Sequence, residues 1–282
     1  MATTDQLQSI ASQIRRDIIR MVTDAKSGHP GGSLSCADFM TALFFEVMDH
    51  HPQSWTREGV GSDLFFLSIG HTSALFYSIL SRSGYFDPSE LASFRRMDSR
   101  LQGHPSVEHG LPGVHVASGS LGQGLSVAAG AALAKKMNGD PKTVYVLIGD
   151  GESEEGQIWE AALFAAHHQV DNLIAITDWN GQQIDGPVEE VGGLGDLQQK
   201  WNSFGWETIV VPNGNDMATI LDGFSKAKAL SKNGKPVMML MKTQMGYGVD
   251  FMMGTHEWHG KTPSAEQAAL ALSQIPETIG DY

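Results

Sequence analysis

Short runs of apolar, β-type residues, separated by stretches with helical spacing, most constrain how this chain of 282 residues can fold. The apolar runs cover residues 63–69, 143–148, 172–177, 207–211 and 236–241. Helical patterns occupy residues 155–168 and 216–231. Strands that alternate with helices at this spacing form a mostly parallel sheet with helices on both faces. The predicted fold class is therefore α/β, and we expect residues 1–282 to form a single domain.

The N-terminal part of the chain is expected to be helical. Isoleucine and valine recur every four positions from Ile10 to Val22, which places them on one face of a helix over residues 5–25. The glycine-rich sequence at 27–32 is expected to interrupt this pattern as a loop that carries a histidine. A second helix is predicted over residues 35–48.

Charge and cysteine content exclude several classes of function. The chain has 19 Lys and Arg against 32 Asp and Glu, a net charge of −13 that disfavours nucleic acids and anionic membranes as partners. Cys36 is the only cysteine, so no internal disulfide can form. The sequence shows no signal peptide and no apolar run long enough to span a membrane. We expect a soluble, cytoplasmic protein.

Two oxygen donors follow neighbouring predicted strands. Asp150 stands between two glycines at the end of strand 143–148, and Asn180 follows strand 172–177. Because parallel strands end at the same edge of a sheet, both side chains should meet there. Carboxylate and amide oxygens suit Mg²⁺ with diphosphate oxygens in its shell. Alone, Gly-Asp-Gly or Asn-Gly is more often a surface turn; the spacing of the two favours a metal site.

Glycine- and histidine-rich motifs extend this pattern along almost the whole chain. They are Ser27-Gly28-His29-Pro30-Gly31-Gly32, Ser68-Ile69-Gly70-His71, Gly103-His104-Pro105, Gly119-Ser120-Leu121-Gly122-Gln123-Gly124, Gly149-Asp150-Gly151 with Asn180, and Trp258-His259-Gly260-Lys261. In this order they resemble the transketolase family. The resemblance implies a thiamine diphosphate-binding fold, thiamine diphosphate with Mg²⁺ (or Ca²⁺ or Mn²⁺), and transfer of a two-carbon ketol unit from a ketose to an aldose.

The resemblance also implies roles for individual residues. The metal would be held by Asp150, Asn180 and the backbone carbonyl of Gln182. The cofactor would contact His71, Gly119, Ser120, Leu121, Gly151, Glu152, Asn180 and His259. The catalytic residues would be His29, His104 and His259, and the substrate-binding residues His29, His259 and Lys261. Glu155 and Glu160 would couple two active sites, although acidic residues near a helix start are also ordinary capping residues.

The histidines carry the prediction for the chemistry. Ketol transfer moves protons on and off sugar oxygens near neutral pH, and imidazole has the unperturbed pKa for this work. A single histidine beside glycine or proline is commonly a loop residue that bonds locally. Four histidines in glycine-rich loops favour a sugar site. Met245 and Tyr247 lie in a loop where some relatives carry basic residues, so the sugar itself stays open.

The resemblance further implies a partner chain. In that family the glutamate that activates the cofactor belongs to a pyrimidine domain, which residues 1–282 do not include, and a C-terminal domain is absent as well. We therefore expect a separate C-terminal subunit within a heterotetramer of two plus two chains. The alternatives are a deoxyxylulose phosphate synthase, a 2-oxoacid dehydrogenase component, or a scaffold subunit without activity. A dinucleotide oxidoreductase is disfavoured, because residues 119–124 read Gly-x-x-Gly-x-Gly.

Overall fold

A parallel sheet forms the centre of the protein. A computed structural model describes residues 2–282, and its main sheet has the strand order β1-β2-β3-β7-β6 with every neighbouring pair parallel. The strands are β1 Leu64–Leu67, β2 Val144–Gly149, β3 Leu173–Trp179, β6 Glu207–Val211 and β7 Val237–Lys242. These strands coincide with the predicted apolar runs. The predicted α/β fold is confirmed.

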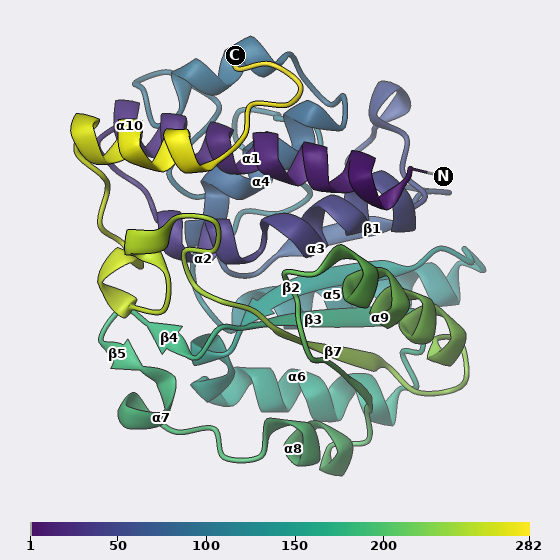
Figure 1. The fold of residues 1–282 in the computed structure, drawn as a ribbon. Helices are drawn as coiled ribbons and strands as arrows, with labels where there is room; N and C mark the ends of the chain where they lie inside the picture. The colour runs from purple at the N-terminus through teal and green to yellow at the C-terminus, as the bar shows by residue number, and fades with distance from the viewer. Residues whose placement is uncertain (1) are drawn as a thin grey trace.

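Helices pack on both faces of this sheet, as Figure 1 shows. One face is covered by α1 Thr4–Asp24, α3 Ala37–Ala42, α4 Ser73–Arg82 and α9 Met217–Leu230, and α10 Ala265–Gln274 packs on α1. The other face is covered by α5 Gln123–Met137, α6 Gly156–His167 and α8 Leu197–Ser203. Alternate strand residues enter opposite cores: Phe65 and Tyr145 lie in the first, and Phe66 and Val146 in the second.

The segment that follows α1 differs from its prediction. The loop ends at His29, because α2 begins at Pro30 and runs to Ser35, so Gly31 and Gly32 are helical. Proline suits the first helical turn, since it lacks only an N–H that has no partner there. A methyl group at Gly31 would lie 2.8 Å from Met245 Cγ, so close packing requires glycine. The single helix expected over 35–48 is also wrong, because α3 gives way to a π-helical turn at Leu43–Val47.

A small two-stranded unit follows β3 along the chain. It pairs β4 Gln182–Gln183 with β5 Gly186–Pro187 in antiparallel register, and the short helix α7 Val188–Val191 follows directly. Figure 1 shows β4, β5 and α2 near the same end of the sheet. This unit therefore brings residues after Asn180 to the edge where the metal site was predicted.

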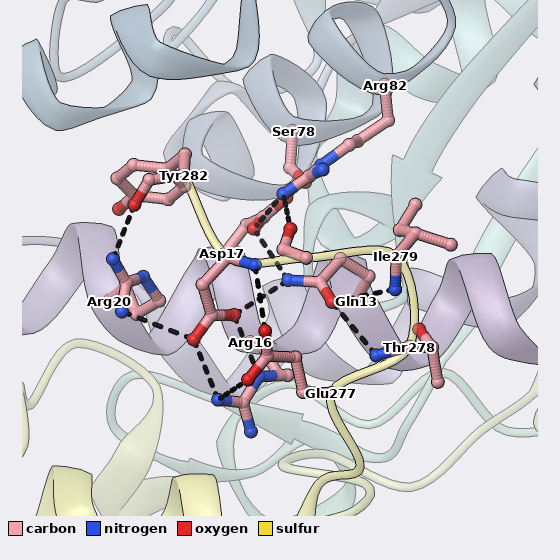
Figure 2. Close-up of polar contacts among 12 residues, drawn as sticks. Gln13, Arg16, Asp17, Arg20, Ser78, Arg82, Glu277, Thr278, Ile279 and Tyr282 are labelled. Carbon is pink, nitrogen blue, oxygen red and sulfur yellow. Dashed lines mark hydrogen bonds and ion pairs between the residues drawn. The ribbon is translucent and has the colours of Figure 1, made fainter.

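The C-terminal segment 275–282 crosses α1 and is held there by polar contacts (Figure 2). The guanidinium group of Arg16 donates two hydrogen bonds to the carboxylate of Asp281, at 2.9 and 2.8 Å. These bonds hold the pKa of Asp281 down to about 2. Arg20 stacks on the Tyr282 ring, 4.7 Å from its centroid. Across residues 2–282, no helix combines the length and the apolar character needed to cross a lipid bilayer.

Candidate active site

A cavity of about 440 Å³ lies at the carboxyl ends of β1, β2 and β3. Ligands of open parallel sheets bind at this edge, because the loops that follow the strands converge there. Many of the residues singled out in the sequence line it. They are His29, His71, Gly119, Leu121, Asp150, Gly151, Glu152, Glu155, Asn180, Gln182 and His259.

Four predicted residues lie outside the cavity wall. The imidazole of His104 is solvent-exposed, with its ring centroid 6.4 Å from that of His29. Ser120 and Lys261 are exposed, and the ammonium of Lys261 lies over the ring of Trp258, 4.9 Å from its centroid. Glu160 is exposed on α6 and does not line the cavity. The roles expected of these four residues stay predictions.

Asp150 is buried at the end of β2 and joins the two strands that carry the predicted metal ligands. Its carboxylate accepts hydrogen bonds from the N–H of Gly151 at 2.8 Å and from the N–H of Gly181 at 2.6 Å. The second bond spans from the β2 end to the β3 end, as the spacing predicted. Burial, followed by the charge of Asp178, raises the pKa of Asp150 to about 7. A cation beside this carboxylate would compensate its buried charge.

Asn180 and Gln182 are held in place by a carboxylate that the sequence analysis did not identify. Asp178 is fully buried and accepts hydrogen bonds from Asn180 Nδ2 and Ser35 Oγ, both at 2.7 Å. Thr243 Oγ1 also donates to it. The amide oxygen Oδ1 of Asn180 accepts from the N–H of Gln182 at 2.8 Å. Asp178 therefore sets which way the Asn180 amide faces, with Oδ1 turned away from Asp178.

Glu152 braces the loop that precedes α5. Its Oε1 accepts a hydrogen bond from the N–H of Gly122 at 2.7 Å and one from the Ser68 hydroxyl, and its Oε2 accepts from the N–H of Gly149 at 3.0 Å. Burial raises the pKa of Glu152. Because its oxygens already bind protein donors, we expect this side chain to serve the cofactor by positioning Gly119–Leu121.

Three imidazoles meet on one side of the cavity. The ring centroid of His29 lies 5.2 Å from that of His71 and 5.7 Å from that of His259, and the last two are 5.0 Å apart. Burial is the main cause that lowers the pKa of each ring, and the pKa of His29 falls to about 4. The rings are therefore neutral near pH 7. Among residues 2–282, the buried Nδ1 atoms of His29 and His259 have no hydrogen-bond partner.

Further cavity residues came from no sequence motif. Gln183 donates from Nε2 to the carboxylate of Glu154 at 3.1 and 3.2 Å, which ties the β4 segment to the turn after β2. Ile184 and Met245 add apolar surface to the cavity. Their only sequence signal was position, since Gln183 and Ile184 directly follow the predicted Asn-Gly turn, and Met245 lies in the loop already noted.

Comparison with known proteins places this site in a family. Residues 6–275 match the family described as "Transketolase, thiamine diphosphate binding domain". The chain belongs to the transketolase family. One of the two subunits of an apulose-4-phosphate transketolase from Actinobacillus succinogenes is 37% identical over 274 residues, with 97% of each chain covered. A 6-deoxy-6-sulfo-D-fructose transketolase subunit from a Clostridium species is 38% identical over 95% of this chain and 96% of the relative.

Solved transketolase structures have the same fold as this member of the family. The transketolase of Leishmania mexicana superimposes with a TM-score of 0.89 at 32% identity, covering 100% of this chain. The chain spans 42% of that longer protein. The thiamine diphosphate-binding domain of a transketolase is thus the whole of the matched region here.

We predict that Gly70→Ala damages this transketolase site. The added methyl group would lie 2.6 Å from the backbone N of Gly119 and 2.7 Å from the carbonyl carbon of Ser118, so the loop that lines the cavity must move. Overpacking of this kind costs about 1–3 kcal/mol. Thermal unfolding should show a lower Tm. Gly130→Ala is the matched control, because nothing lies within 4 Å of its added methyl group; an equal Tm for both variants would contradict the prediction.

Proposed function

We propose that this chain is the N-terminal subunit of a thiamine diphosphate-dependent transketolase that moves a two-carbon ketol unit from a ketose to an aldose. The observation that carries the proposal is the cluster of neutral imidazoles beside the buried carboxylate at the sheet edge. Transfer between sugars needs groups that exchange protons with hydroxyls near pH 7, and neutral imidazole can both donate and accept.

The residues at the sheet edge fit a metal ion and the diphosphate of the cofactor. No group of three or more His, Cys, Asp or Glu side chains within residues 2–282 has the arrangement of a metal site. The proposed set instead combines one carboxylate, Asp150, with the Asn180 amide and the Gln182 carbonyl, leaving diphosphate oxygens to complete the shell of Mg²⁺. The raised pKa of Asp150 supports this set, since the carboxylate lacks a compensating positive charge.

The chain's own residues would then act on the sugar. When bound, thiamine diphosphate supplies the nucleophilic carbon that exchanges the two-carbon unit. His29 and His259 would bind donor hydroxyls through their unpartnered Nδ1 atoms and hold or release a proton there. His104 would meet the part of the sugar that lies nearer the solvent. Lys261, Glu155 and Glu160 keep the substrate-binding and coupling roles proposed for them.

A second chain would complete the enzyme. Two relatives of similar length are named as transketolase subunits, which supports a partner that carries the pyrimidine domain in a heterotetramer of two plus two. Exposed apolar side chains on and before α5 and α6 support the same assembly, because such surface favours association: Leu121, Val127, Leu163 and Phe164. The single buried thiol of Cys36 agrees with a cytoplasmic location.

Calorimetry and a product assay test this function together. Thiamine diphosphate with Mg²⁺ is titrated into the chain alone and into its mixture with the candidate partner, and we expect tight binding only in the mixture. The mixture should convert a ketose donor to an aldose that is two carbons shorter, with phosphorylated, sulfonated and branched sugars screened in turn. Release of carbon dioxide from pyruvate without ketol transfer would contradict the proposal, and so would cofactor binding without turnover of any ketose.

A further inference from the structure

Arg95 lies behind the histidine cluster and contacts two of its loops. Its Nη1 donates a hydrogen bond to Ser27 Oγ at 2.7 Å, and its Nη2 donates to the carbonyl of Gly103 at 3.0 Å. Ser27 stands two residues before His29, and Gly103 directly precedes His104. One guanidinium group therefore bridges the loops that carry these two histidines. Arg95 is not among the residues that line the cavity.

The backbone around Arg95 is built to hold this bridge. Arg95 has a left-handed conformation with φ of 57°, which is strained for a residue other than glycine. Its N–H donates to the carbonyl of Leu101 at 2.9 Å, which closes the turn between the two. The guanidinium group lies against Gly103, where an added methyl group would be 3.0 Å from Cζ. The Gly103 carbonyl also accepts from Ser73 Oγ at 2.7 Å.

We propose that Arg95 is a positioning residue of the sugar site, which clamps the His29 loop to the His104 loop through its two-pronged hydrogen bonds. The inference rests on the proposed function, since it assigns these histidines to the sugar. Planar guanidinium suits this task better than an ammonium, because its fork sets the angle between two acceptors as well as their distance.

The positive charge of Arg95 adds a second effect. The titratable or charged groups that face His29 are His259, Arg95, His104 and the adjacent ring of His71. Burial comes first and His259 second among the causes that lower the pKa of His29, and Arg95 follows. For His104 the causes are burial and then Arg95. Loss of this charge should make protonation easier, so the pKa of both imidazoles should rise.

Separate variants distinguish the clamp from the charge. Arg95→Gln removes both, Arg95→Lys keeps the charge without the fork, and Ser27→Ala removes one acceptor while the charge stays. Arg96→Gln is the matched control, because the side chain of Arg96 is exposed and pairs only with the exposed Asp24 among the described residues. Imidazole titration by NMR on the chain, and kcat and KM of the reconstituted enzyme against pH, are the readouts.

Arg95→Gln should lower kcat about tenfold to hundredfold, the size expected for small displacements of catalytic groups. The acid limb of its pH profile and the NMR titrations of His29 and His104 should both move to higher pH. Cofactor affinity should stay within about twofold of wild type, since the cavity wall is intact. Arg95→Lys and Ser27→Ala should lower kcat without moving the titrations.

The result that would overturn the inference is an Arg95→Gln chain with kcat and imidazole titrations equal to those of Arg96→Gln. If Arg95→Gln fails to fold, Ser27→Ala decides the clamp through kcat alone. If wild-type enzyme transfers no ketol unit, the proposed function fails by itself, and the NMR titrations still judge whether Arg95 acts on the two histidines.

Discussion

Replacing Asp150 with asparagine is expected to abolish magnesium-dependent binding of thiamine diphosphate and, with it, turnover. Asparagine has the same shape and keeps an acceptor for one of the N–H groups of Gly151 and Gly181, so the loops should stay in place. The substitution removes the negative charge that the metal would neutralise. We expect affinity for the cofactor with Mg²⁺ to fall by at least about 100-fold, beyond the loss typical of residues that only support a metal ligand.

Calorimetry on the chain mixed with its partner measures this effect directly. Asp222→Asn is the control, because Asp222 is exposed on α9 and pairs with Lys226 far from the cavity. The Asp150→Asn chain should unfold at a temperature no lower than wild type without cofactor, since an uncompensated buried charge is removed. Retention of wild-type cofactor affinity by Asp150→Asn would contradict the proposed metal site.

The largest expected loss of stability follows from Arg82→Met. Asp17 is fully buried on α1, and its carboxylate accepts hydrogen bonds from Arg82 Nε and Nη2, each at 2.8 Å, and from Ser78 Oγ at 2.8 Å. Arg82 also donates to the carbonyl of Gly280, so it helps to hold the C-terminal segment (Figure 2). Methionine would leave the carboxylate buried without its cation. The expected cost is about 3–5 kcal/mol, a large share of a typical folding stability of about 5–15 kcal/mol.

Urea unfolding followed by circular dichroism gives the free energy of unfolding for this comparison. Lys226→Met is the matched control, since the Asp222–Lys226 pair is exposed and such pairs contribute about 0–1 kcal/mol. The double variant Asp17→Leu with Arg82→Met should be more stable than Arg82→Met alone, because no unpaired buried charge remains. Equal stability of Arg82→Met and Lys226→Met would show that the buried pair contributes little.

Local patterns were sufficient for the strands and for the meeting of two site residues. Apolar runs predicted all five strands of the main sheet, because strands buried on both faces must be apolar throughout. Asp150 and Asn180 could be brought to one edge from their spacing alone, because neighbouring parallel strands end together. The hydrogen bond from Gly181 to Asp150 shows that the two strand ends meet.

Local patterns were insufficient where close packing decides the backbone. The glycines at 31 and 32 predicted a loop, yet they belong to a helix, because Met245 and the Trp258 carbonyl lie too close to Gly31 for any side chain. Glu152 was expected beside the cofactor, and only the structure shows that donors from three separate loops occupy its carboxylate. Contacts of this kind join residues far apart in the chain, so no local spacing encodes them.

By itself, the sequence determined the fold class, the edge of the sheet that carries the site and the residue types available there. Periodicity and side-chain chemistry are local properties, and they can be read along the chain. Only the tertiary structure decided that His29, His71 and His259 meet, that His104 lies at the solvent side and that Arg95 bridges two loops. Distance and burial set these interactions and the resulting pKa shifts, and both arise only when separate segments pack together.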